Sequence, residues 1–431
     1  MEDSIASARR RWLLVAGVLL VAGALCVEAG KHWLAEHWAH SPDPQDWGLA
    51  AELQPDNAGY WYRLGQFRQS DFEQTDLNQA ILHYHRATQL NPRSSLYWMG
   101  LASAFEMKGE PGRAQQAFEK AKSAHPVSSK VAWRYGNFLL RQGQLTPAFA
   151  EIRRSLASDP RLAGFAVGLC WRASQDVERI LDEVLPPEKD FYLEALRYFA
   201  SQREIGAALS AWEKLLTLHQ PLDLPQAFPL VERLIEASRM DEAEEVWQQA
   251  CRAAGRLPDV AASTLVWNGG FEFNLLQGGF GWRQRPHGSY EYGFDIRTYR
   301  SGARSLRVRF GGTHNVDFQH LFQYVPVEPR TRYRFSAALR TEAISTDSGM
   351  RFRIFDPKHR AALDTLTPSL VGSQPWTLQQ TEFTTGPETR LLVIALRRLP
   401  SRKFDNKLRG TVWVDDVSLA PVLTFGRREA K

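Results

Sequence analysis

Alanine and proline recur at one fixed interval in the first half of this chain, and no other sequence feature constrains the fold as strongly. The recurring positions are Ala80, Ala114 and Ala148, and Pro92, Pro126 and Pro160. A period of about 34 residues is typical of stacked helix pairs, each of which buries its apolar face against the next pair. The sequence therefore predicts an α-solenoid in this region.

The residue types at the recurring positions suit such helix pairs. A small side chain lets two antiparallel helices approach closely, and proline ends the second helix because it lacks an N–H and disfavours helix in the residue before it. Weaker repeats follow at Ala208 with Trp212 and, close to one period further on, at Ala243 with Trp247. We expect about five or six helix pairs over residues 46–255.

The first three units share more than these alanines and prolines, although the first has about three extra residues in its inter-helix turn. They contain, unit by unit, Trp61, Leu64, Gly65, Tyr84 and Ala87; Trp98, Leu101, Ala102, Phe105, Phe118 and Ala121; and Gly136, Leu139, Ile152 and Ser155. With these residues the segment 45–255 resembles the tetratricopeptide repeat (TPR) family. The resemblance implies a concave surface that binds a protein partner, and no catalysis.

Four residues are candidates for that protein-binding groove: Tyr62, Arg134, Asn137 and Arg141. Ordinary solvent-exposed helix surface is the alternative, and a single sequence leaves both readings open. Residues 1–262 carry a net charge of −5, which fits a solvated repeat array and identifies no ligand.

The N-terminal sequence has the features of a membrane-targeting segment. Arg9, Arg10 and Arg11 precede an uncharged run from Trp12 to Val27, whose length lies between a long signal-peptide core and a short membrane span. Adjacent arginines favour an N-terminus that stays inside while the following chain is exported. We predict a cytoplasmic tip and an uncleaved signal-anchor helix over residues 1–31, followed by a linker over residues 32–45. Cleavage after Ala29 is the alternative, and either reading places the bulk of the chain outside the cytoplasm, in the periplasm of a bacterium.

A different pattern begins after a predicted linker at residues 256–263. Apolar and polar residues alternate in Leu306–Phe310, Arg332–Arg340 and Met350–Ile354, as in half-buried strands. Leu391–Leu396 is continuously apolar and predicts a central strand. Residues 264–421 are therefore expected to form an all-β sandwich, followed by a tail at residues 422–431. The fold class is α plus all-β, in a multidomain chain.

A set of landmarks runs through this β region in order. They are Asn268, Gly269, Gly270, Phe271 and Glu272; Gly281 and Trp282; Ser301 to Leu306; Gln323, Tyr324 and Val325; Tyr333 and Phe335; Gln374, Pro375 and Trp376; Glu382, Phe383 and Thr384; and Val412 to Leu419. With this set the region resembles the xylan- and cellulose-binding modules, which are galactose-binding-like jelly rolls. Glu328, Pro329 and Arg330 replace the usual Pro-Gly turn of that family. The resemblance implies carbohydrate binding.

The same resemblance implies a structural calcium ion held by Glu272 and by Asp415 or Asp416. Carboxylate oxygens suit this hard cation, which would join the two ends of the module. Hydrogen bonds or ion pairs with nearby arginines are the alternative, because calcium takes about six to eight oxygen ligands and only these few can be named.

Sugar rings stack on aromatic faces flanked by polar side chains. The candidate glycan-binding residues are Trp282, Tyr290, Tyr292, Phe318, Gln319 and His320. Packing in the core is the alternative, above all for Trp282. Residues 263–421 carry a net charge of +8, and outward arginines on the predicted strands are Arg307, Arg309, Arg332, Arg334, Arg351 and Arg353. These charges favour an acidic polysaccharide or another anionic envelope surface, with an ordinary soluble strand face as the alternative.

No motif for catalysis is found in the sequence. A phosphate-binding glycine loop, histidines at metal-ligand spacing and a nucleophile elbow are all absent. Cys26, Cys170 and Cys251 form no disulfide framework, and two separately buried thiols are favoured over a Cys170–Cys251 bridge. The export signal argues against a nucleic-acid partner.

The sequence thus predicts a non-enzymatic, membrane-anchored adaptor. Its helical array would bind a protein and its sandwich a glycan, as in polysaccharide assembly or export. The alternative is a purely protein-binding scaffold whose sandwich caps the last repeat without sugar affinity.

Overall fold

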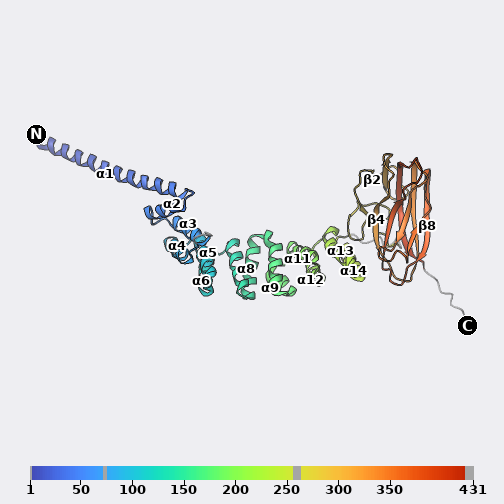
Figure 1. Ribbon diagram of the computed structural model, residues 1–431, viewed down its shortest axis with the longest axis horizontal. Helices are drawn as coiled ribbons and strands as arrows, with labels where there is room; N and C mark the ends of the chain where they lie inside the picture. The colour runs from blue at the N-terminus through green and yellow to red at the C-terminus, as the bar shows by residue number, and fades with distance from the viewer. Residues whose placement is uncertain (1, 71–74, 256–263, 423–431) are drawn as a thin grey trace. The chain divides into compact units, whose positions relative to one another are not determined.

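The computed structural model describes residues 2–70, 75–255 and 264–422, with helices in the first part of the chain and strands in the last (Figure 1). Its internal contacts divide the chain into two units, Met1–Phe191 and Tyr192–Lys431. The extra residues expected in the first inter-helix turn, the predicted linker 256–263 and all but the first residue of the tail lie outside the described ranges.

The first unit is helical. Its elements are α1 (Glu2–Ala39), α2 (Pro44–Leu53), α3 (Ala58–Ser70), α4 (Leu77–Leu90), α5 (Ser95–Met107), α6 (Pro111–Ala124), α7 (Ser129–Arg141), α8 (Leu145–Ser158), the 3-10 helix η1 (Pro160–Leu162), α9 (Ala163–Ser174), α10 (Val177–Arg179), the π-helix η2 (Ile180–Val184) and the start of α11 (Lys189–Gln202).

The predicted repeat spacing corresponds to regular helix pairs. Ala80, Ala114 and Ala148 are fully buried in α4, α6 and α8, the second helices of three consecutive pairs. The prolines at 92, 126 and 160 each lie just beyond the end of those helices. Each period of the sequence therefore corresponds to one pair of antiparallel helices, such as α3 and α4.

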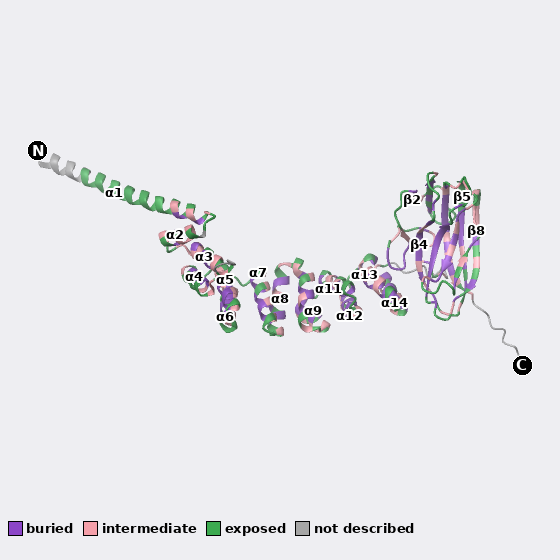
Figure 2. Cartoon of the chain, in the orientation of Figure 1, coloured by how far each residue is buried: buried purple, intermediate pink, exposed green. Residues whose placement is uncertain are grey.

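Helix α1 extends well beyond the predicted anchor. Its stretch from Trp12 is long and apolar enough to cross a membrane, by length and composition, and its apolar residues are exposed (Figure 2). The helix then continues to Ala39 through most of the segment where the sequence predicts a linker. Ala35 and Ala39 are buried against α2 and α3, so the end of α1 belongs to the helical array. The sequence of this last part of α1, from His32 to Ala39, has apolar residues at helical spacing and contains no glycine or proline, which favours a helix.

The second unit begins with more helices. They are the remainder of α11, then α12 (Ile205–Thr217), the 3-10 helix η3 (Leu224–Ala227), α13 (Phe228–Glu236) and α14 (Met240–Ala253). Trp212 and Trp247 are buried in α12 and α14, as the weak repeats predict. Cys170 and Cys251 are separate buried thiols, and burial raises the pKa of Cys170 to about 12.

The rest of the second unit is a two-sheet antiparallel β fold. Its strands are β1 (Arg283–Gln284), β2 (Tyr290–Asp295), β3 (Ser305–Gly311), β4 (Phe318–Pro326), β5 (Arg332–Ile344), β6 (Arg351–Phe355), β7 (Asp364–Leu366), β8 (Gly372–Thr384), β9 (Leu391–Arg398) and β10 (Arg409–Pro421). One sheet has the order β1-β4-β9-β6-β7 and the other the order β2-β3-β10-β5-β8. The two sheets enclose one core, to which both contribute alternate residues.

Strand β9 lies in the middle of its sheet, and every one of its residues is buried. The continuous apolar run from Leu391 therefore corresponds to the predicted central strand. Strand β5 alternates between buried and exposed positions over Arg332–Ala337, as the period of two predicts.

The last helix pair packs against the start of the β fold. Trp247 of α14 lies edge-on to Trp267 and Phe280, with ring centroids 6.2 and 5.9 Å away. Glu232 of α13 accepts a hydrogen bond of 2.7 Å from the backbone N–H of Gly279 and pairs with Arg283. Apolar and charged contacts thus join the end of the helical region to the sandwich.

Candidate functional site

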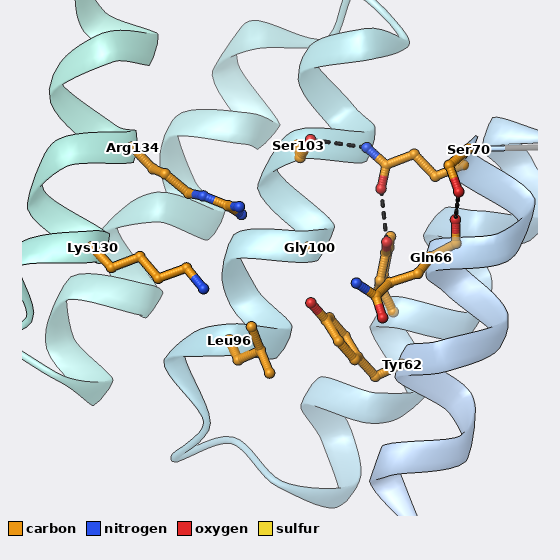
Figure 3. A pocket seen from close by; sticks show the side chains of 10 residues that line it. Tyr62, Gln66, Ser70, Leu96, Gly100, Ser103, Lys130 and Arg134 are labelled. Atoms are coloured by element: carbon orange, nitrogen blue, oxygen red, sulfur yellow. Dashed lines mark hydrogen bonds between the residues drawn. The ribbon is translucent and has the colours of Figure 1, made fainter. Parts of the chain in front are cut away.

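A pocket of about 470 Å³ opens on the first helices of three consecutive repeats. Most of its lining residues come from α3 and α5, two come from α7, and Tyr84 of α4 lies behind them. The residues are Tyr62, Gln66, Gln69 and Ser70; Leu96, Gly100 and Ser103; Lys130 and Arg134; and Tyr84 (Figure 3).

One wall of the pocket is fixed by two hydrogen bonds, one within the first repeat and one to the next repeat. The Gln69 side chain donates to the Ser103 hydroxyl at 2.8 Å and accepts from the Tyr84 hydroxyl at 2.7 Å. The oxygen and the nitrogen of the Gln69 amide are therefore both engaged, and the side chain is held across α3, α4 and α5. Gln66 is exposed beside it, with its side-chain amide turned to the hollow.

The opposite wall is cationic. Lys130 and Arg134 are one helical turn apart on α7, and Figure 3 shows both side chains extending towards Tyr62 and Gln66. Both are exposed, and within the described part of the chain neither forms an ion pair. Two positive charges therefore face a polar pocket without a carboxylate to neutralise them.

The back of the pocket is aromatic. The rings of Tyr62 and Tyr84 are 5.5 Å apart, and burial raises the pKa of both hydroxyls, while the nearby Arg134 charge opposes that rise. Gly100 keeps the centre open, because a Cβ there would lie 2.8 Å from Tyr84 and 3.0 Å from Tyr62. The pocket thus combines an apolar floor, amide groups and two unpaired cations, which suits an acidic side chain or a chain-terminal carboxylate.

Two of the four predicted groove residues, Tyr62 and Arg134, line this pocket. Asn137 instead donates to the Trp133 carbonyl of its own helix at 2.7 Å, and Arg141 forms a two-bond ion pair with Glu106. The predicted groove therefore contains one pair of residues available to a ligand and one pair that is already satisfied within the protein.

Sequence reasoning missed Lys130 and the amide wall, although the repeat itself holds the signal. Lys130 lies one full repeat after Leu96, and Arg134 lies one full repeat after Gly100. Equivalent positions of successive repeats lie on the same face of the array. Lys130 is four residues before Arg134 on the same helix, so once Arg134 is placed in the groove, Lys130 is expected there as well.

The predicted glycan-binding residues separate into three groups. Trp282 and Phe318 are fully buried in the core of the sandwich, which is the alternative that the sequence left open. Tyr290 is also nearly buried, and Tyr292 is 43% exposed on β2 of the sheet β2-β3-β10-β5-β8. Gln319 and His320 lie on β4 of the other sheet, and Gln319 accepts a hydrogen bond of 3.0 Å from Arg353.

The predicted calcium ligands gather around the loop before β3. The Asp415 carboxylate accepts backbone N–H bonds from Arg300 at 2.8 Å and Ser301 at 3.2 Å, and Glu272 accepts one from Ala303 at 3.1 Å. Asp416 pairs with the Ser301 hydroxyl and lies 3.6 Å from the Arg300 guanidinium. Burial raises the pKa of Asp415 despite these donors.

In this structure, the carboxylates of these acids act as hydrogen-bond acceptors for neighbouring backbone and side-chain groups. N–H donors occupy Asp415 where calcium would need free oxygen lone pairs. Among the described residues, no group of three or more His, Cys, Asp or Glu side chains could hold a metal ion. The calcium ion stays a prediction.

Residues 69–129 and 108–163 match the family model of the tetratricopeptide repeat. The fold is similar to YrrB, a TPR protein with an unusual peptide-binding site, at 14% identity over 49% of this chain and 94% of that chain with a TM-score of 0.27. MamA matches at 14% identity over 46% and 89% of the two chains, and pilF of Pseudomonas aeruginosa at 16% over 45% and 90%, both with a TM-score of 0.27.

No curated protein matches the chain. The family model and the regular helix pairs agree on the repeat class. The first helical unit of this chain carries tetratricopeptide repeats, a class of repeat that generally binds protein partners.

Proposed function

We propose that this chain is a membrane-anchored adaptor whose repeats bind an acidic segment of a partner protein. The observation that carries this proposal is the pair of unpaired cations, Lys130 and Arg134, opposite the amide wall of the pocket. A carboxylate placed between them would receive charge-assisted hydrogen bonds and would stack its apolar stem on Tyr62. A segment lying along α3, α5 and α7 would then present that carboxylate to the pocket.

The other parts of the chain suit an adaptor in the cell envelope. We propose that α1 anchors it with the bulk of the chain extracytoplasmic, and that the β-sandwich, as a jelly roll, binds a glycan or an envelope surface. Polysaccharide assembly or export would use such a part. We also propose that the chain is not an enzyme, with calcium as a structural ion at most.

One observation favours the alternative of a purely protein-binding scaffold. The loop around Gly279 covers Trp247 of the last helix pair, as a cap on a repeat array would. The capping contacts involve Gly279 and Arg283, so variants of the sandwich away from these two residues test glycan binding separately.

Photo-crosslinking in cells tests the protein-binding proposal. Leu96 is 37% exposed at the pocket, so a photoreactive amino acid in its place reports what enters. We expect discrete protein adducts that fall by about a hundredfold or more when Lys130→Glu and Arg134→Glu are combined, since each hydrogen bond to a charged group contributes about 1.5–3 kcal/mol and tenfold in affinity corresponds to about 1.4 kcal/mol.

The matched control combines Arg86→Glu and Lys120→Glu, which change equivalent charges at exposed positions of the second helices α4 and α6. We expect this variant to keep the wild-type adducts. Adducts that persist in the Lys130 and Arg134 variant, or that disappear equally in both variants, would contradict a role for the pocket.

A further inference from the structure

Arginines cover the outer face of the sheet β1-β4-β9-β6-β7. The strand register places Arg283, Phe322, Ala395 and Arg353 in one row across four strands, and Arg397 opposite Arg351 in the next. Arg285 follows β1 and donates its backbone N–H to the His320 carbonyl at 2.8 Å. We call the arginine face the surface formed by Arg283, Arg285, Arg351, Arg353 and Arg397.

Aromatic rings lie under these arginines and orient them. The guanidinium carbon of Arg285 is 4.8 Å from the ring centre of Phe322, that of Arg283 is 4.5 Å from Tyr324, and that of Arg353 is 4.5 Å from Phe355. The rings form a small apolar cluster with Val393 and Ala395, separate from the core between the sheets. Stacked guanidinium groups keep their N–H edges available for hydrogen bonds to an anion.

Arg351 and Arg397 place two like charges side by side on neighbouring strands. They are direct cross-strand partners on β6 and β9, and like charges at such positions destabilise a sheet. Arg397 is only 8% exposed, yet its Nε has no hydrogen-bond partner, and neither has the buried Nε of Arg351. Burial lowers the pKa of Arg351, and the Arg397 charge adds to that effect.

Carboxylates of the protein neutralise only part of this charge. Arg283 pairs with Glu232, Arg353 with Asp364 and Arg397 with Asp317. In the described ranges, no carboxylate pairs with Arg285 or Arg351. The arginine face therefore keeps two uncompensated positive charges next to unsatisfied N–H groups.

His320 borders the same surface. Its ring lies 5.0 Å from that of His287, and its buried Nδ1 has no partner. Burial lowers the pKa of His320, and the charges of His287, Arg285 and Arg397 lower it further. The positive charge of the arginine face therefore extends to His320.

We propose that the arginine face binds an acidic polysaccharide, with Arg285 and Arg351 receiving its carboxylate or sulfate groups. This inference rests on the proposed glycan-binding role of the sandwich and specifies its ligand class and its residues. Planar guanidinium groups match such anions with two parallel hydrogen bonds, and the aromatic rings beneath them hold the guanidinium planes in position. The site lies on a different sheet from Tyr292.

The test uses the full chain in non-ionic detergent and measures binding to polygalacturonate, dextran sulfate and uncharged dextran. We expect saturable binding to at least one of the two charged chains and none to uncharged dextran. Arg351→Gln should weaken binding by about tenfold, the effect of removing one charge-assisted hydrogen bond. It should leave the melting temperature equal or higher, because the like-charge pair is relieved.

Arg307→Gln is the matched control, since Arg307 is exposed on β3 of the other sheet. We expect less than a twofold change there. Equal losses in both variants would show general attraction to polyanions and overturn the proposal. Binding only to uncharged dextran would overturn it while leaving glycan binding intact. No binding to any of the three polysaccharides would overturn the glycan role itself.

Discussion

Tyr60 connects the first repeat to the end of α1. Its hydroxyl donates a 2.7 Å hydrogen bond to Glu36, and its side chain is 7% exposed. Burial, followed by the Glu36 hydrogen bond and charge, raises the pKa of Tyr60 to about 12. The folded protein therefore keeps this proton at pH values where the unfolded chain has lost it.

We expect Tyr60→Phe to lower the free energy of unfolding by about 0.5–1.5 kcal/mol at neutral pH, through loss of one hydrogen bond. The stabilisation by Tyr60 is complete below the unfolded pKa of 10.0 and is lost as the pH rises to about 12. The difference between wild type and variant should therefore shrink over that interval. Urea unfolding followed by circular dichroism, from pH 8 to pH 12, measures it.

The variant itself supplies the control for other titrating groups. Tyr135, whose pKa is also raised to about 12 by burial first and then by Glu119, is present in both proteins and cancels in the difference. A difference that stays constant across the whole pH range would show that Tyr60 does not stabilise the junction through its proton.

Single residues of the pocket were only partly predictable from the sequence. Tyr62 and Arg134 follow from their place on the first helices of the repeats. Whether a groove residue is free depends on its neighbours in space: Arg141 is neutralised by Glu106, which lies about one repeat earlier, on the first helix of the preceding pair. The arginines at 351 and 353 were recognised as outward, but their pairing with β9 required the sheet register.

At the scale of elements, small residues set the spacing within each repeat. Gly136 of α7 faces α8, where a Cβ would lie 2.7 Å from the Ile152 side chain and 3.3 Å from the Ala148 carbonyl oxygen. Gly65 has the same relation to Tyr84 in the first repeat, at 2.7 Å. The repeat pattern thus encodes the distance between its two helices.

We expect Gly136→Val to destabilise the first unit by about 1–3 kcal/mol, because the added methyl groups have no room against Ile152 and the α8 backbone. Chemical denaturation followed by circular dichroism measures the change. Gly112→Ala in α6 is the control, since nothing lies within 4 Å of its added Cβ. It should be neutral or stabilising by up to about 1 kcal/mol, given the helix propensity of alanine. Equal losses in the two variants would refute the packing role of Gly136.

Elements with a strong period were predictable, and elements defined by contacts were not. The helix pairs of the repeats and strand β5 follow from periods that the sequence displays directly, and strand β9 follows from a continuous apolar run. Helical spacing from His32 to Ala39 is compatible with the continuation of α1, but the burial of Ala35 and Ala39 against α2 and α3 is a tertiary contact that the sequence does not display. The π-helix Ile180–Val184 likewise lies between the strong repeats that end at Pro160 and the weaker repeats that begin at Ala208.

At the scale of the whole molecule, the contact between the last helix pair and the sandwich decides whether the second unit acts as one body. Gly278 and Gly279 lie against aromatic rings, with a Cβ at Gly278 only 2.3 Å from Phe228. Phe228 and Trp247 stack with centroids 6.3 Å apart. Arg390 of the sandwich also pairs with Asp241 of α14 at 2.8 Å.

Gly279→Ala should weaken this connection. Gly279 has a positive φ of +56°, and an added Cβ would lie 2.4 Å from the Trp247 ring, so both backbone and packing oppose the change. We expect faster hydrogen exchange of the α14 amides, by about tenfold for each 1.4 kcal/mol of local destabilisation, and unchanged exchange in α7 of the first unit. Mass spectrometry of the exchanged peptides resolves the two helices. Gly288→Ala, where nothing lies within 4 Å, should leave α14 protected. If α14 exchanges at the wild-type rate in Gly279→Ala, the sandwich does not hold the last helix pair, and the two parts of the unit act independently.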